Sequence, residues 1–208
     1  MIKDFIKKIK WLGHDGFRIE GNQIIYIDPF KITGGLKADI ILVTHEHFDH
    51  CSPDDIALIQ KEDTTIVTEK DSASKLKGNI RIISPGDQIT INGIKIEAVP
   101  SYNTDKEFHK KDVNWLGFII EIDGIRIYHA GDTDHIPEMK SFQVDIALLP
   151  VSGTYVMTAE QAVKAALDIQ PKVAIPMHFG AIVGEESDAI QFQKALENKI
   201  DVIILKKE

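Results

Sequence analysis

Four side chains that bind metal ions well lie within six residues of one another: His45, His47, Asp49 and His50. If the chain is extended here, His45 and His47 are two residues apart and point the same way, so both can bind one cation. Asp49 and His50 follow where the chain begins to turn, and they can face a second cation. Neutral imidazole and carboxylate oxygen are typical zinc ligands, with manganese or iron as alternatives. The cluster therefore predicts a site for one or two ions, with Zn²⁺ favoured.

Three further residues of metal-binding type occur far along the sequence, and two of them follow strand-like segments. Asp132 comes shortly after the apolar segment 125–128, His178 comes shortly after 173–175, and a glycine lies close to each. Functional side chains are often presented by loops at the ends of rigid elements. His109 lies in a polar loop instead, where a metal ligand and a solvated surface histidine are equally good interpretations.

Short segments rich in isoleucine and valine predict many β-strands, followed by mixed strands and helices. The expected strands are 23–27, 40–44, 64–68, 80–83, 88–91, 94–99, 116–122, 125–129, 145–149, 173–176 and 202–205. Asn92-Gly93 and Asp123-Gly124 predict tight hairpin turns, because both dipeptides tolerate positive φ. Helices are expected over 52–61, 158–169 and 187–198, with a short one near 72–76. Strands such as 40–43 are apolar on both faces, so helices should cover stacked sheets.

The composition is that of a globular protein, with 208 residues, 43% apolar and 27% charged, and a net charge of −8. We expect one domain over residues 1–208. The negative charge disfavours a nucleic-acid partner, and no segment has the roughly 18 apolar residues of a membrane-spanning helix.

Cys51 is the only cysteine, which together with the absence of a signal peptide indicates the cytoplasm. A buried thiol is favoured over a metal-binding one there. A homo-oligomer is compatible with the sequence.

The order of these motifs resembles the metallo-β-lactamase superfamily over most of the chain. The resemblance rests on the segment from His45 to His50, on Gly131-Asp132 and on His178. Further segments resemble one branch, the largely uncharacterised metal-dependent hydrolases related to ascorbate phosphate lactonase; they are 12–17, 27–30, 128–133 and 175–178. The resemblance implies an α/β (α+β) fold, a four-layer αββα sandwich with the site at one edge between the two sheets.

The same resemblance implies a role for each ligand. His45 and His47 match ligands of a first metal ion, Asp49, His50 and His178 match ligands of a second, and Asp132 matches the carboxylate that bridges them. Many members carry another first-ion histidine just after the stretch that matches 98–100, where this chain reads Ser101-Tyr102-Asn103. His109 is the only histidine between His50 and His129. We therefore expect His109 as the substitute; otherwise the first ion keeps an open position, or only one ion binds tightly.

Such a site predicts hydrolysis of a small-molecule substrate. Two cations lower the pKa of a shared water towards neutrality, and the metal-bound hydroxide attacks an ester, lactone or phosphodiester. Asp49 is the expected catalytic residue, because it can orient the water and carry its proton. Asp28, His14 and His129 are candidate hydrogen-bond partners of the metal-binding imidazoles.

Three alternatives remain. A diiron redox protein on the same scaffold is disfavoured, because such members resemble this chain but carry a carboxylate where His47 stands. A nucleic-acid hydrolase generally needs a substrate-clamping domain. A non-catalytic metal-binding module is disfavoured by the complete ligand set. Tyr102, Asn103, Trp115 and Tyr155 could line the pocket, and Lys110 and Lys111 could attract an anionic substrate, although a solvated lysine pair is favoured.

Overall fold

Two mixed β-sheets form the centre of the protein, which is described here from a computed structural model covering residues 2–208. The first sheet has the strand order β1-β2-β3-β4-β5-β6. Its antiparallel pairs are β1/β2 and β2/β3, and the remaining pairs are parallel. The strands are β1 (Ile9–Gly13), β2 (Gly16–Glu20), β3 (Ile24–Ile27), β4 (Ile40–Leu42), β5 (Thr65–Thr68) and β6 (Asn79–Ile82).

The second sheet has the order β13-β12-β11-β10-β9-β8-β7. Strands β10 to β13 pair in parallel, whereas β7 to β10 form an antiparallel meander. The strands are β7 (Gln88–Ile91), β8 (Ile94–Pro100), β9 (Leu116–Ile122), β10 (Ile125–His129), β11 (Ile146–Pro150), β12 (Val173–Met177) and β13 (Asp201–Val202). The β10–β12 strands therefore end at the same edge of the sheet, where their following loops can meet.

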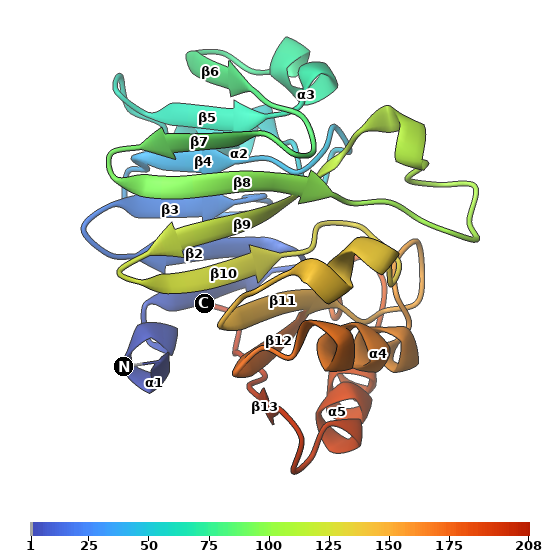
Figure 1. The fold of residues 1–208 in the computed structure, drawn as a ribbon. Helices are drawn as coiled ribbons and strands as arrows, with labels where there is room; N and C mark the ends of the chain where they lie inside the picture. Colours follow the sequence, from blue (N-terminus) through green and yellow to red (C-terminus); the bar gives the residue numbers. More distant parts are fainter. Residues whose placement is uncertain (1) are drawn as a thin grey trace.

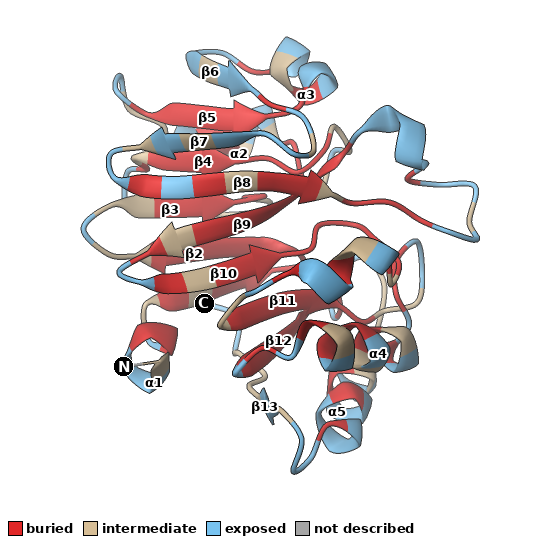
Figure 2. Ribbon diagram, in the orientation of Figure 1, coloured by how far each residue is buried: buried red, intermediate tan, exposed pale blue. Residues whose placement is uncertain are grey.

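Helices lie on the outer faces of the sheets, except for the N-terminal helix, which lies below the sheets in Figure 1. They are α1 (Ile2–Ile6), α2 (Pro53–Ile59), α3 (Lys70–Lys75), α4 (Ala159–Ile169) and α5 (Glu186–Ala195), with 3₁₀ turns at Lys111–Val113 and Pro137–Ser141. Helices α4 and α5 are buried on the side that faces the sheet and exposed on the other (Figure 2). The expected four-layer α/β sandwich is thus confirmed. Within residues 2–208, no helix has the length and apolar character needed to cross a membrane.

Successive side chains of the buried strands point to opposite faces of the sheet, and this divides the hydrophobic core into two parts. Ile40 and Leu42 of β4 belong to the large cluster shared with the second sheet, whereas Ile41 belongs to a smaller cluster with Ile56 and Ile59 of α2. Successive side chains of a strand point to opposite faces, so a strand buried on both sides must be apolar throughout. This explains the uninterrupted Ile40-Ile41-Leu42-Val43 run.

Both predicted hairpin turns are present, joining β7 to β8 and β9 to β10. Asn92 and Gly93 have φ of 50° and 83°, and Asp123 and Gly124 have φ of 53° and 72°. The sequence analysis did not predict β1, β2 or α1. Lys10, Arg18 and the flanking glycines interrupt the apolar pattern of β1 and β2, and only pairing with β3 and with the C-terminal segment orders them. The strand expected over 202–205 is short, covering only Asp201–Val202.

A capping box at the start of α4 fixes the loop that precedes this helix. Thr158 accepts a hydrogen bond from Gln161 N, and the Gln161 side chain accepts one from Thr158 N. We expect Thr158→Ala to lower the free energy of unfolding by about 1 kcal/mol, because one helix-terminal N–H loses its partner. Urea denaturation followed by circular dichroism measures this. The exposed α4 residue Lys164 provides the control, since Lys164→Ala should change stability by less than about 0.5 kcal/mol. Equal effects of the two substitutions would contradict the capping role.

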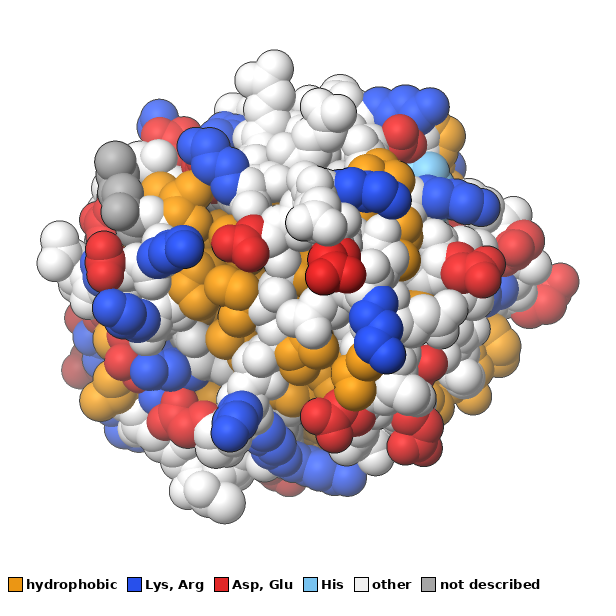
Figure 3. Space-filling model, turned by 90° about the horizontal axis from the view of Figure 1, so that it is seen from below, with side chains coloured by type: hydrophobic (Ala, Val, Ile, Leu, Met, Phe, Trp, Pro, Cys, Tyr) orange, Lys and Arg blue, Asp and Glu red, His pale blue; other side chains and the backbone are white. Residues whose placement is uncertain are grey.

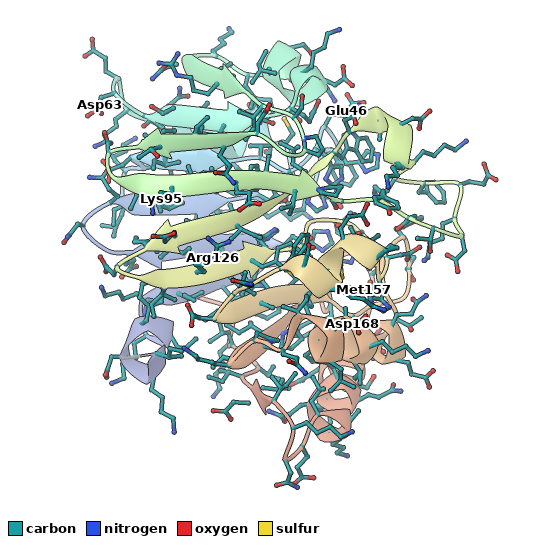
Figure 4. All side chains as sticks on the ribbon, in the orientation of Figure 1. Glu46, Asp63, Lys95, Arg126, Met157 and Asp168 are labelled. Carbon is teal, nitrogen blue, oxygen red and sulfur yellow. The ribbon has the colours of Figure 1, made fainter. Side chains whose placement is uncertain are left out.

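The predicted metal-binding residues follow strands of both sheets at one edge of the molecule. Glu46, which lies between His45 and His47 in the sequence, is at this edge, whereas Asp63 lies at the opposite edge (Figure 4). Residues His45 to His50 follow β4, Asp132 follows β10, and His178 follows β12.

Candidate metal centre

Four groups of potential ligand atoms lie among the described residues, and the two that contain most of the predicted ligands lie side by side at this edge. One group contains His45, His47 and His109, and the other contains Asp15, His50, Asp132 and His178. Within each group, one ligand atom per residue lies within 4.8 Å of all the others. The structure therefore brings together residues that are more than 100 positions apart in the sequence.

The first group places His109 beside the two histidines that follow β4. Nε2 of His45 lies 3.0 Å from Nδ1 of His47, and the ring of His109 lies 5.4 and 5.2 Å from the rings of these two residues. The ring of Trp115 packs against all three imidazoles. Burial lowers the pKa of His45 well below its usual range, so its imidazole is neutral and can donate a lone pair. Two nitrogen lone pairs so close repel each other unless a proton or a cation lies between them.

Asp132 faces both groups. Its Oδ1 lies 3.4 Å from Nε2 of His50 and 3.4 Å from Nε2 of His178, and its Oδ2 lies 3.3 Å from Nε2 of His109. Gly131 places this carboxylate, because a Cβ on Gly131 would stand only 2.7 Å from the carbonyl oxygen of Leu116, and its φ is +62°. A carboxylate between two sets of imidazoles has the position that a bridging ligand needs.

The His50 and Asp132 side chains of the second group shift one another's pKa values so that their ionised forms are favoured. Burial opposes the charged form of His50, but the Asp132 and Asp28 carboxylates outweigh it and raise the pKa of His50 well above its usual range. Burial also opposes the Asp132 carboxylate, but His50 and His178 outweigh it and hold the pKa of Asp132 well below its usual range. The buried carboxylates of this centre therefore favour positive charge beside them, which a proton on His50 or a metal ion can supply.

Hydrogen bonds at Nδ1 hold the His50 and His45 imidazoles and leave their Nε2 atoms towards the centre. Asp28 accepts hydrogen bonds from His50 Nδ1 at 2.8 Å and from the Thr44 hydroxyl at 2.5 Å. The Thr44 oxygen lies 3.0 Å from His45 Nδ1 and can accept its proton. Asp28 thus contacts His50 directly and His45 through Thr44, so it can orient one histidine of each group.

The remaining partners include two that the sequence analysis did not predict. Nδ1 of His178 is hydrogen-bonded to the Ser152 hydroxyl at 2.9 Å, and Nδ1 of His109 can donate to the Tyr155 carbonyl at 3.1 Å. Nothing in the local sequence of Ser152 or Tyr155 signals these contacts, because both arise where the loop after β11 meets other loops.

His14 and His129 have different surroundings. Nε2 of His14 lies 3.1 Å from the Asp49 carboxylate, so His14 contacts a predicted ligand directly. His129 is buried and bonds to the backbone, at Asp15 O and Gly131 N. These two hydrogen bonds connect the turn before β2 with the loop before Asp132, and His129 also forms a group of potential ligand atoms with Asp15 and Asp28.

Several ligand atoms are buried without a hydrogen-bond partner, among the residues that the structure describes. They include His50 Nε2, His109 Nε2, Asp132 Oδ1 and both carboxylate oxygens of Asp15. A buried polar atom without a partner is costly, and these atoms converge on one place. Imidazole nitrogens and carboxylate oxygens in this arrangement fit a borderline divalent cation such as zinc.

Five residues of the centre have left-handed backbone conformations, which L-residues adopt rarely. They are His14 (φ 52°), Asp28 (42°), His109 (49°), Tyr155 (67°) and His178 (60°). Strained backbone of this kind concentrates at functional sites, where the surrounding structure enforces it. The concentration supports a functional role for this edge of the molecule.

Asp15 is a residue of this centre that the sequence analysis missed. It lies in the turn between β1 and β2, is completely buried, and belongs to the group of His50, Asp132 and His178. Burial raises the pKa of the Asp15 carboxyl well above its usual range. An acidic residue directly after His14, between two short apolar segments, was the one available signal.

We expect Asp15→Asn to weaken zinc binding by roughly 10- to 100-fold, the effect typical of residues that support metal ligands. The physical reason is the loss of a carboxyl group that can ionise on metal binding, because the amide of asparagine cannot supply a negative charge beside His50, Asp132 and His178. Competition with a chromophoric chelator measures the affinity. Asp63→Asn is the matched control, because Asp63 is exposed at the opposite edge (Figure 4). Unchanged affinity in Asp15→Asn would show that this carboxylate does not support the metal.

A pocket of about 300 Å³ opens onto the centre. Its polar lining comes from His47, Asp49, His109, Asp132 and His178. Cys51, by contrast, is buried against α3 and does not line the pocket, and burial raises the pKa of its thiol to about 11. A thiol with so high a pKa is a poor nucleophile and ligand.

Comparisons with known proteins agree with this arrangement. Residues 8–178 match the family described as "Beta-lactamase superfamily domain". The chain is 35% identical over 217 residues to a UPF0173 metal-dependent hydrolase of Thermococcus onnurineus, with 96% of each chain covered. A solved candidate metal-dependent hydrolase of Parabacteroides distasonis is 39% identical, with a TM-score of 0.85, and 95% of this chain and 93% of that chain are covered.

Igni18, a metallo hydrolase of Ignicoccus hospitalis, is similar in fold, with a TM-score of 0.79, 24% identity, and 96% of this chain and 94% of that chain covered. None of these three relatives is named as an ascorbate phosphate lactonase. That part of the predicted resemblance stays a prediction.

Proposed function

Because this chain belongs to the beta-lactamase superfamily domain family, with the UPF0173 metal-dependent hydrolases as relatives, we propose that it hydrolyses a small ester, lactone or phosphodiester at a site for one or two zinc ions. The observation that supports this most strongly is the Asp132 carboxylate, which lies within 3.4 Å of imidazoles from both ligand groups. His45, His47 and His109 would hold one ion, and Asp49, His50 and His178 the other. A bound divalent cation supplies Lewis acidity and lowers the pKa of a water molecule towards neutrality.

Asp49 is the proposed proton carrier. Burial opposes its ionisation, but the hydrogen bond from His14 outweighs this and lowers the pKa of Asp49 below its usual value. Asp49 is therefore a carboxylate at neutral pH and can accept a proton from the attacking water. The water oxygen then bonds to the acyl carbon or the phosphorus, the bond to the leaving oxygen breaks, and Asp49 returns the proton to that oxygen.

Two alternatives make different predictions. A diiron redox protein would favour harder ligands than the three imidazoles of the first group. Metal analysis of the purified protein with an electronic spectrum separates the two, and a stable oxo-bridged diiron band would contradict hydrolysis. A nucleic-acid hydrolase is disfavoured because basic and acidic side chains alternate on the face seen from below (Figure 3), and the net charge is −8.

Metal removal tests the proposal directly. Dialysis against a chelator should abolish hydrolysis of a panel of aryl esters, lactones and phosphodiesters, and added Zn²⁺ should restore it, because the cation supplies the acidity. Mn²⁺ and Fe²⁺ are tested in parallel to identify the metal. Circular dichroism before and after treatment controls for unfolding. Full hydrolysis by the chelated protein would contradict the proposal.

We further propose a cytoplasmic location, which the single buried thiol supports. The hydrophobic cluster that both sheets share supports one domain over residues 1–208. Gel filtration with light scattering would test whether the chain forms a homo-oligomer.

A further inference from the structure

Exposed apolar side chains gather around the pocket at the metal centre. Ten large hydrophobic residues are exposed in the described part of the chain, and four of them line this one pocket. They are Phe48, Phe108, Tyr155 and Ile182, with exposed fractions of 68%, 51%, 42% and 40%. Scattered exposed apolar residues are ordinary, but a group beside a functional site indicates a surface that binds an apolar ligand.

These four side chains come from four different loops, and ring contacts hold the three aromatic ones in place. Phe48 follows β4, Phe108 lies between β8 and β9, Tyr155 follows β11, and Ile182 follows β12. The rings of Phe108 and Tyr155 pack edge to face at 4.8 Å, and Phe48 packs on Phe30 at 5.7 Å. The apolar wall is therefore already formed, and a ligand does not have to order it.

The pocket offers no positive side chain to an anionic substrate. Among residues 2–208, neither lysine nor arginine lines it. The lysines of the neighbouring loop have acidic partners, since Lys106 contacts Asp134, Lys110 contacts Glu107 and Lys111 contacts Glu138. Phosphate groups are usually bound by arginine or lysine. A phosphodiester would have only the metal ions as cationic partners, and the Asp49 and Asp132 carboxylates would oppose it.

We propose that this site selects small, neutral carboxylic esters or lactones that carry an alkyl or aryl group next to the scissile carbonyl. The inference rests on the proposed hydrolytic function and narrows its substrate class. The apolar group lies against Phe108, Tyr155 and Ile182, and the carbonyl faces Asp49 and Asp132. A volume of about 300 Å³ is at the lower limit of ligand pockets, so the substrate is small.

A series of phenyl esters with the same leaving group tests the selection on the zinc-loaded protein. From phenyl acetate to phenyl propanoate and phenyl butanoate, kcat/KM should rise by about fourfold per methylene group, the value expected for burial of one such group. Bis(p-nitrophenyl) phosphate, an anionic diester, should be a poor substrate. Phe108→Ala and Ile182→Ala should each reduce the increase in kcat/KM per added methylene group. Leu58→Ala, which removes an equally exposed side chain on α2, should leave this increase intact.

Binding gives a second, independent measurement. Calorimetric titration with acetamide, butanamide and hexanamide, which are neutral and poorly hydrolysed, should show affinity rising with chain length, and Phe108→Ala should weaken hexanamide most. A flat chain-length dependence in both experiments, or a preference for the anionic diester, would overturn the substrate class while leaving hydrolysis in place. If no ester or diester is hydrolysed, the proposed function fails, and the amide titration still decides whether the pocket binds neutral apolar groups.

Discussion

Replacing Asp132 by alanine should reduce kcat/KM by roughly 100- to 1,000-fold, the scale seen when a group that stabilises the reacting centre is removed. Its two oxygens contact His50 and His178 on one side and His109 on the other, at 3.3–3.4 Å. Without this carboxylate, both groups of imidazoles lose their shared negative partner, and the repulsion between the two cations of the proposed site would no longer be offset. Zinc content should therefore fall together with the rate.

Steady-state kinetics and metal analysis by mass spectrometry measure the two effects of Asp132→Ala. Asp132→Asn keeps the shape and removes the charge, so it separates loss of packing from loss of metal binding. Asp168→Asn is the matched control, because Asp168 also pairs with a histidine, His135, at 2.7 Å, yet lies on α4 outside the pocket (Figure 4). Wild-type activity in Asp132→Asn would remove the basis of the proposed site.

His109→Ala should lower the rate by roughly 100-fold and abolish binding of the ion that we propose for His45, His47 and His109. Three protein ligands are usual in catalytic zinc sites, and only two would remain. Since Nδ1 of His109 can donate to the Tyr155 carbonyl, the loss also frees the loop after β11 from one of its contacts. The second group keeps all its ligands, so one ion should stay bound.

Zinc per chain after gel filtration, and the visible spectrum of the Co²⁺-substituted protein, would report this loss of a single ion. His135→Ala is the control, since it removes a histidine that pairs with Asp168 away from the pocket. If His109→Ala retains the zinc content and rate of the wild type, His109 is not a ligand, and the first ion is bound by two histidines or is absent.

The fold could be predicted from sequence wherever a continuous apolar segment becomes a strand that is buried on both faces. The runs 40–44, 64–68 and 116–122 became strands β4, β5 and β9, because isoleucine- and valine-rich segments are stable only when buried between layers. The strands β1 and β2 escaped prediction, because Lys10 and Arg18 break their apolar pattern. Arg18 is nevertheless buried, since it pairs with Glu20 and Glu208, and residues separated by 190 positions make no pattern in the sequence.

The sequence alone determined the local part of the centre: His45, His47, Asp49 and His50 follow one strand within six residues, and their chemistry is visible there. Only the tertiary structure decided which distant groups join them. His109 reaches the first group although it belongs to a polar loop, and Asp15 contributes a buried carboxyl group. The apolar wall is made by Phe48, Phe108, Tyr155 and Ile182 from four different loops. Residue type and local spacing fix what a side chain can bind, whereas the packing of the two sheets fixes which loops meet at their common edge.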